Sequence, residues 1–110
     1  MSVYRSFLFT PGNHPRRVEK SLALSTDAVI LDLEDAVAQN EKEAARVTVV
    51  EALAQPRRGL AYVRVNALST PWSYGDIEAV VVRGLDGLIL PKVESAADLQ
   101  TVEWMVSSLE

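Results

Sequence analysis

Three carboxylates follow a short apolar run early in the chain. The apolar residues and the carboxylates together read Val29-Ile30-Leu31-Asp32-Leu33-Glu34-Asp35-Ala36. Residues two apart on an extended strand point to the same side, so Asp32 and Glu34 share a face, and Asp35 begins the loop that follows. Carboxylates this close repel one another unless a cation, a basic ligand or a shared proton lies nearby. The run therefore indicates a functional site. The alternative is a turn capped by Asp35, with the other two carboxylates in solvent.

Arg64 is the candidate cation for this cluster. It lies in a second apolar run, Val63-Arg64-Val65-Asn66, which reads as a strand with its polar end at the same edge of a sheet. A guanidinium in such a place is suited to binding the carboxylate of a substrate through two parallel hydrogen bonds. The alternative is that Arg64 forms a structural ion pair with Asp32 or Glu34. Arg64 can have both roles if it forms the ion pair and binds the substrate in turn.

A basic pair, Arg16 and Lys20, follows the loop at Pro11-Gly12. The two are four residues apart in a predicted helix and therefore share a face. Two cations near a helix N-terminus are suited to binding phosphate groups. The alternative is that they are solvent-exposed and serve only solubility.

These residues belong to a pattern in which a strand and a helix alternate four times. Strands are predicted at 5–10, 28–33, 61–66 and 86–91, and each is followed by a segment with helical periodicity. Helix starts are predicted from residues with N-cap character or spacing, namely Asn13, Asn40 with Glu43, Ser73 with Asp76, and Ser95 with Asp98. The predicted apolar faces contain Val18 and Leu22, then Ala44, Val47, Val50 and Leu53, and finally Leu99, Val102, Val106 and Leu109.

Alternating strands and helices imply an α/β fold with a parallel sheet. The sheet is either open and doubly wound or half of an eight-stranded (β/α) barrel. Polar residues occur near the C-terminal end of every strand, as expected of a barrel whose active site lies on one rim. These residues are Thr10, Asp32, Glu34, Asp35, Arg64, Asn66, Lys92 and Glu94. We therefore predict that residues 1–110 form the N-terminal portion of a TIM barrel, as one domain of four β-α units.

Composition narrows the classes of partner. The chain has 110 residues, of which 48% are hydrophobic, and a net charge of −4. These values argue against disorder and against binding of nucleic acid or an anionic membrane. No cysteine is present, and no signal peptide or membrane span is evident in the sequence, so we expect a soluble cytoplasmic protein.

Four segments together resemble the strand-end motifs of the citrate lyase β-subunit-like family, within the HpcH/HpaI aldolase/citrate lyase group. They are Arg5-Ser6-Phe7-Leu8-Phe9-Thr10-Pro11-Gly12-Asn13, Leu31-Asp32-Leu33-Glu34-Asp35-Ala36-Val37, Val63-Arg64-Val65-Asn66 and Leu90-Pro91-Lys92-Val93-Glu94. The resemblance covers nearly the whole chain in order. It implies a TIM-barrel carbon–carbon lyase that uses Mg²⁺ to cleave or form acyl-CoA or acyl-carrier thioesters of acids such as citrate and malate.

The resemblance also assigns roles to residues. It implies that Arg64 binds the substrate carboxylate, and that Phe9, Arg16 and Lys20 contact coenzyme A. It places the direct Mg²⁺ ligands after Glu110. Glu34 and Asp35 would then hold metal-bound waters and orient Arg64, and Asp32 would be a catalytic residue of the same cluster.

Other readings remain open. The segment is expected to be inactive on its own, and it can instead be a non-catalytic half-barrel that binds a CoA-like or dicarboxylate ligand or only assembles. A third reading is a flavodoxin-like receiver with Mg²⁺ at the acidic cluster. The first reading implies a homo-oligomer, with other lyase subunits as further possible partners. The acid, the acyl carrier and the general base are not determined by these residues.

Overall fold

The fold alternates strands and helices throughout the part of the chain that the computed structural model describes, which is residues 7–23, 28–34, 37–56, 59–91 and 96–109. The elements in order are β1 (Phe7–Pro11), α1 (Pro15–Ala23), β2 (Ala28–Asp32), the 3₁₀ turn η1 (Gln39–Glu41), α2 (Lys42–Leu53), β3 (Leu60–Arg64), α3 (Ser73–Val80), β4 (Gly87–Ile89) and α4 (Ala96–Leu109). No helix among these residues is both long enough and apolar enough to cross a membrane.

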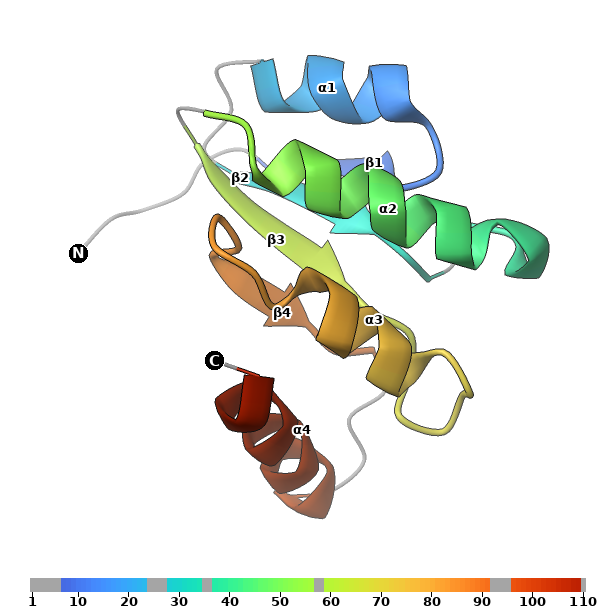
Figure 1. Ribbon diagram of the computed structural model, residues 1–110, viewed down its shortest axis with the longest axis vertical. Coiled ribbons are helices and arrows are strands. Elements are labelled where there is room, and N and C mark those ends of the chain that lie inside the picture. The colour runs from blue at the N-terminus through green and yellow to red at the C-terminus, as the bar shows by residue number, and fades with distance from the viewer. Residues whose placement is uncertain (1–6, 24–27, 35–36, 57–58, 92–95, 110) are drawn as a thin grey trace.

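The sheet is parallel, and its strands lie in the order β1-β2-β3-β4. Each strand is therefore the neighbour of the next one in the sequence. Since β-α-β crossovers are right-handed, a sheet that always grows in one direction places its helices on one face, as Figure 1 shows. A doubly wound sheet would reverse its strand order and have helices on both faces. The described fold is thus that of half a (β/α) barrel, as the sequence predicts, and the flavodoxin-like reading is wrong.

The core lies between the sheet and the helical layer. Alternate strand residues face the helices, and they are nearly all Val, Leu or Ala. This buried cluster comprises Val29, Leu31, Leu33, Ala61, Val63 and Val65 from the strand segments, Val37 from the connection after β2, and Val18, Ala45, Val49, Leu53, Ile77, Val80 and Val102 from the helices. The remaining strand residues point to the opposite face, which in a complete barrel is the interior.

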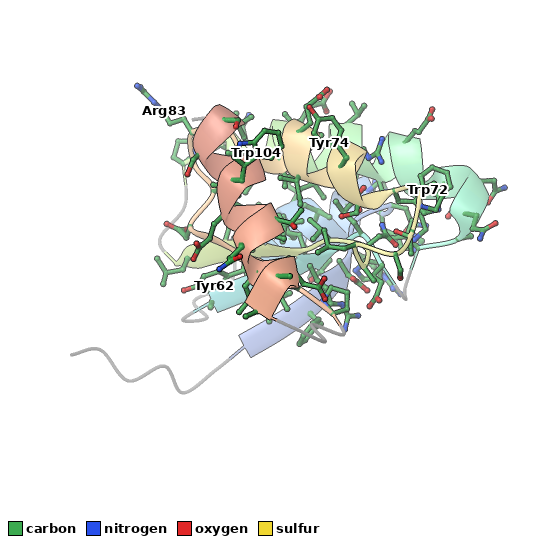
Figure 2. The ribbon with its side chains drawn as sticks, turned by 90° about the horizontal axis from the view of Figure 1, so that it is seen from below. Tyr62, Trp72, Tyr74, Arg83 and Trp104 are labelled. Carbon is green, nitrogen blue, oxygen red and sulfur yellow. The ribbon has the colours of Figure 1, made fainter. Side chains whose placement is uncertain are left out.

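On that opposite face the strands are in simple register, and their side chains form rows across the sheet. One row pairs Ile30 with Tyr62 and Tyr62 with Gly87. A Cβ atom at Gly87 would lie 2.7 Å from two atoms of the Tyr62 ring, so only glycine leaves space for this ring. Figure 2 shows Tyr62 on the side of the sheet away from Tyr74, which projects from the helical layer.

The predicted helix caps are wrong at the first three helices. Helix α1 begins at Pro15, a residue whose fixed φ suits the first helical position, and Asn13 instead donates its side-chain N–H to Glu41. Helix α2 has Glu41 at its N-cap and makes no side-chain cap bond. At α3 the N-cap is Trp72. The cap predicted from Ser95 lies outside the described residues.

The apolar face predicted for α2 is confirmed at Leu53 but wrong at Ala44 and Val47, which are exposed. The buried residues are Lys42, Ala45, Val49 and Leu53, and Val47 is 58% exposed. The segment has alanine and valine on more than one face, so helical spacing alone does not choose between them. In α4 the prediction is confirmed at Val102 and Val106 but wrong at Leu99, which is 47% exposed. The side chain of Leu109 is outside the described set.

The strand predictions are confirmed in number and order but not in length. Strand β3 ends at Arg64 and not at 66, and β4 has three residues where six are predicted. The Thr10 hydroxyl does not join the polar rim. It faces the helices, where it lies 2.5 Å from that of Ser21 on α1. Alternation explains this, because Thr10 is the immediate neighbour of Phe9, which faces the other way.

The core assignment can be tested by truncating one leucine in each environment. Leu31→Ala, at a fully buried position, should lower the free energy of unfolding by about 2–5 kcal/mol because it leaves a cavity. The matched control is Leu99→Ala at the exposed position, where the change should stay within about 0.5 kcal/mol. Urea denaturation of the full-length protein measures both. Equal losses would contradict the assignment of the helix-facing core.

Candidate functional site

The centre of the candidate site is an ion pair between Asp32 and Arg64. Arg64 donates from Nε to Asp32 Oδ1 at 2.9 Å and from Nη2 to Asp32 Oδ2 at 2.8 Å. The Asp32 side chain is 2% exposed, and that of Arg64 is 24% exposed. Paired, nearly parallel hydrogen bonds of this kind fix the plane of the guanidinium. The structural reading of Arg64 as the partner of Asp32 is therefore confirmed.

Strand register brings the two residues together. Asp32 ends β2, Arg64 ends β3, and the two are direct partners in the parallel pairing. Gly12, just after β1, donates its backbone N–H to the Asp32 carbonyl at 2.8 Å. A Cβ on Gly12 would lie 2.8 Å from that same oxygen, which is closer than side chains are found, so this loop approaches β2 only because the residue is glycine. Three strand ends thus meet at Asp32.

Glu34 is held close to the pair by its backbone. Its N–H donates to Asp32 Oδ1 at 2.9 Å, and its carboxylate Oε1 lies 3.6 Å from Arg64 Nε. The buried ammonium of Lys42 donates to the carbonyls of Leu33 at 2.9 Å and Glu34 at 3.1 Å. The sequence predicts that Asp32 and Glu34 face the same way, and both carboxylates do lie beside Arg64. Asp35 lies outside the described residues.

A second polar cluster lies behind the pair, and the sequence did not indicate its role. Asp76, fully buried on α3, accepts from Arg46 Nε at 2.8 Å, and its other oxygen accepts from Asn66 N at 2.9 Å and Asn66 Nδ2 at 2.6 Å. Asn66 Nδ2 also donates to the Leu33 carbonyl at 2.9 Å. The spacing of Ser73 and Asp76 resembles a helix cap, which masked this use. An acidic residue on the buried face of a short helix was the available signal.

A shallow pocket of about 400 Å³ opens at the strand ends and is lined by Phe9, Thr10, Pro11, Asp32 and Arg64. The Phe9 ring is 54% exposed and lies over the Arg64 guanidinium, 5.1 Å from ring centre to Cζ. Such a contact is a cation–π interaction. The pocket therefore has a cationic group with one aromatic wall, which is suited to a small anion attached to an apolar or planar group.

The basic pair predicted to bind coenzyme A is on the outside of the fold. Arg16 and Lys20 are both exposed on α1, to either side of buried Val18. Neither lines the pocket at Arg64. The structure thus brings Phe9 to the pocket and leaves the two basic residues on the adjacent helix, and their role as coenzyme A contacts stays a prediction.

That the direct Mg²⁺ ligands lie outside the described residues stays a prediction. Within them, no group of three or more His, Cys, Asp or Glu side chains is placed to hold a metal ion. Both oxygens of Asp32 already accept N–H groups, and a guanidinium lies against them. A second cation there would be repelled.

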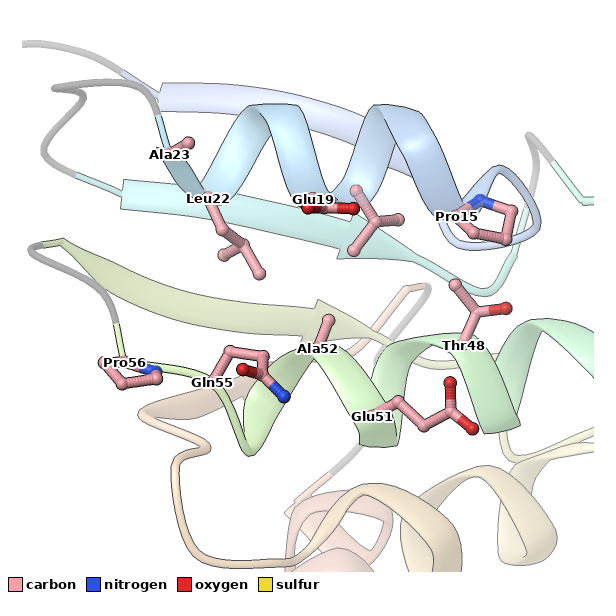
Figure 3. Close-up of a pocket in the computed structure, with 10 residues that line it drawn as sticks. Pro15, Glu19, Leu22, Ala23, Thr48, Glu51, Ala52, Gln55 and Pro56 are labelled. Atoms are coloured by element: carbon pink, nitrogen blue, oxygen red, sulfur yellow. The ribbon is translucent and has the colours of Figure 1, made fainter.

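Another pocket, of about 510 Å³, lies between α1 and α2, as Figure 3 shows. Its two walls carry Glu19 and Glu51, and no basic residue is among the ten that line it. An acidic ligand would meet repulsion in this pocket. The pocket at Arg64 is therefore the better candidate for binding an acid.

Comparison with known proteins gives consistent results. The sequence profile of the family described as HpcH/HpaI aldolase/citrate lyase matches residues 5–110. A (3S)-malyl-CoA thioesterase from Cereibacter sphaeroides is 42% identical over 108 residues, which cover 96% of this chain and 38% of the relative. The citrate lyase subunit beta of Leuconostoc mesenteroides is 41% identical over 108 residues, covering 96% of this chain and 36% of the relative. The chain thus spans little more than a third of the length of these curated relatives.

A solved structure agrees with the fold. The CitE protein of Mycobacterium tuberculosis, in complex with magnesium, acetoacetate and coenzyme A, superposes with a TM-score of 0.74 at 40% sequence identity. The match covers 87% of this chain and 35% of that protein.

The role of Asp32 can be tested with a double-mutant cycle. Asp32→Asn should lower the free energy of unfolding by about 1–3 kcal/mol, because it leaves a half-buried guanidinium without its charged acceptor. In an Arg64→Ala background Asp32→Asn should lower the free energy of unfolding by clearly less, since the guanidinium that would lose its acceptor is absent. Denaturant titration of the four proteins gives the coupling energy. Additive effects would contradict the pair as the central contact.

Proposed function

The chain belongs to the HpcH/HpaI aldolase/citrate lyase family, and we propose on that basis that it supplies the carboxylate-binding side of an active site that cleaves or forms a carbon–carbon bond in a hydroxy-acyl thioester. The observation that carries this proposal is the Arg64 guanidinium, which lies in an open pocket at the strand ends with its plane fixed by Asp32. Matching relatives are a citrate lyase subunit, malyl-CoA thioesterases and a malyl-CoA lyase.

In this proposal Arg64 binds the carboxylate of the hydroxy-acid portion. Asp32 takes two of the five N–H donors of the guanidinium, and it holds the group in one plane before the substrate arrives. A preset plane lowers the entropic cost of binding a planar carboxylate. Glu34 adds a second negative charge, because its Oε1 lies 3.6 Å from Arg64 Nε, and its attraction helps to hold the guanidinium at the site. Asp35, the next residue in the sequence, is proposed to have the same role as Glu34.

The thioester carrier is proposed to be coenzyme A or a carrier of similar chemistry. Phe9 provides an exposed aromatic surface next to Arg64, and Arg16 and Lys20 provide cations on the helix that follows β1. The relative with bound coenzyme A supports this proposal. An aromatic surface suits the apolar arm of the carrier, and the two cations suit its phosphates.

Magnesium is proposed as the metal of the complete site, because the related CitE protein was solved with it. In metal-dependent lyases of this kind the ion supplies stabilisation of a developing enolate oxygen. Within the described residues no group of three or more His, Cys, Asp or Glu side chains is placed to hold a metal ion, and we propose that the direct ligands of magnesium lie outside these residues. The 110-residue segment by itself is accordingly proposed to be inactive, and the working protein is proposed to be an oligomer, with other lyase subunits as further possible partners.

The role of Arg64 is tested by changing the shape of its cation and not its charge. Arg64→Lys should weaken binding of oxaloacetate by about tenfold or more, nearly as much as Arg64→Ala, because lysine cannot form the paired hydrogen bonds. Calorimetry on the full-length protein measures the affinity. Product analysis of malyl-CoA turnover then separates a lyase, which releases an oxo acid and acetyl-CoA, from a thioesterase, which releases malate and free coenzyme A. A lysine variant with unaltered affinity would refute carboxylate binding by Arg64.

The basic pair is tested by comparing two ligands. Arg16→Gln with Lys20→Gln should weaken binding of coenzyme A several-fold, as expected for the loss of two exposed phosphate contacts, and should leave the affinity for oxaloacetate nearly unchanged. The control is Arg83→Gln, which removes an exposed cation from the α3–β4 connection. Calorimetry with both ligands measures the difference. Equal weakening of both would show a general effect of charge in place of a carrier contact.

A further inference from the structure

The buried polar cluster around Asp76 links three elements behind the Arg64 pocket without lining it. Asp76 is on α3, Arg46 is on α2, and Asn66 follows β3. The pocket is lined by Phe9, Thr10, Pro11, Asp32 and Arg64, so Asp76 does not touch what binds there. Any influence of Asp76 on the site must therefore pass through another residue.

That residue is Asn66. Its side-chain Nδ2 donates to Asp76 Oδ2 at 2.6 Å and to the Leu33 carbonyl at 2.9 Å. An amide nitrogen has two N–H donors, so these two bonds use both of them and fix which way the amide faces. The backbone N–H of Asn66 donates to the same Asp76 oxygen at 2.9 Å. Asp76 thus determines the position of the group that holds Leu33.

Leu33 in turn holds Glu34 in place. The Leu33 N–H donates to the Arg64 carbonyl at 2.9 Å, and its own carbonyl accepts from Asn66 and from Lys42. The next residue, Glu34, donates its backbone N–H to Asp32 Oδ1, and its carbonyl accepts a hydrogen bond from Lys42 Nζ. The short segment 33–34 is therefore fixed on both sides of each peptide group. Its placement fixes the point on the backbone from which the Glu34 side chain reaches to within 3.6 Å of Arg64 Nε.

The cost of burying Asp76 argues that its charge has a use. A carboxylate with no exposed surface is strongly unfavourable unless it is paired and hydrogen-bonded. Here one oxygen pairs with Arg46, whose guanidinium also donates to the Trp72 carbonyl at 3.0 Å and lies over the Trp72 ring. The other oxygen is directed to Asn66. A neutral amide at 76 can accept on one side only, and on the other side its NH₂ group would face a donor.

We infer that Asp76 is a positioning residue for the Arg64 pocket: through the Asn66 amide and the Leu33 carbonyl it sets where Glu34 stands relative to the Arg64 guanidinium. The inference rests on the proposed function, because it concerns the same pocket. It adds to that proposal a residue that touches no ligand. It also explains why the end of β3 continues into a polar residue that is buried and not exposed at the rim.

The experiment uses the Arg64 Nε–Hε signal in a ¹H–¹⁵N correlation spectrum of the full-length protein, assigned by its loss in Arg64→Lys. Asp76→Asn should shift or broaden this signal although residue 76 does not line the pocket that contains Arg64. The same variant should lower kcat/KM for the thioester by about ten- to a hundredfold, the loss expected when a distant change displaces a binding group.

The matched control is Asp86→Asn. Asp86 Oδ2 accepts the Ala61 N–H at 2.7 Å, so this carboxylate binds a backbone N–H at the opposite end of the same strand, β3. It should leave the Arg64 signal and kcat/KM unchanged. If Asp86→Asn gives the same losses, the effect is general weakening of β3 and the inference fails.

A second variant covers the case in which Asp76→Asn does not fold. Asn66→Ala deletes only the side-chain link and keeps the backbone N–H that donates to Asp76, and it should reproduce the change in the Arg64 signal. An unaltered signal in a folded Asn66→Ala protein overturns the inference. The proposed function fails separately, if Arg64→Lys leaves oxaloacetate binding intact, and the Arg64 signal still reports on positioning in that event.

Discussion

The paired hydrogen bonds between Asp32 and Arg64 hold the ends of two neighbouring strands in one arrangement, and most of the polar structure in the described residues is organised around them. Asp32 accepts from Arg64 with its carboxylate, from Glu34 N–H with the same group, and from Gly12 N–H with its carbonyl. A buried carboxylate is costly without such partners. Asp32 therefore connects the loop after β1, through its backbone, with the turn after β2 and the end of β3, through its carboxylate.

The division of the sheet into two faces gives this pair its setting. On the helix side, Val, Leu and Ala residues supply the burial that stabilises the fold. On the other side, the register places the side chains in rows, and the row at the strand ends includes Asp32 and Arg64. Stability and chemistry are thus assigned to opposite faces of the same strands. This separation is typical of barrels, in which strand ends carry the active site.

Polar groups buried on the helix side form a second cluster, which supports the residues around the Asp32–Arg64 pair. Lys42, Arg46, Asn66 and Asp76 all have hydrogen-bond partners there, and two of them bind the Leu33 carbonyl. Networks of this kind stabilise one conformation only when every member has its partners, because a lost bond in a low-dielectric interior is expensive. The Leu33–Glu34 segment beside the pocket is therefore held in place by polar side chains on the helix side of the sheet.

The sequence by itself determined the alternation of strands and helices, the parallel sheet and the family, and it singled out Asp32, Glu34 and Arg64 as the centre of a candidate site. These follow from local periodicity and from motifs whose spacing is fixed along the chain. Only the tertiary structure decided that Arg64 pairs with Asp32, that Thr10 faces the helices, and that α2 buries Lys42 and Val49 in place of Val47. It alone also revealed Asp76 as the partner of Asn66. Helical spacing and cap-like pairs are satisfied by several arrangements of the same residues, and the choice among them depends on contacts between segments distant in sequence, which no local pattern encodes.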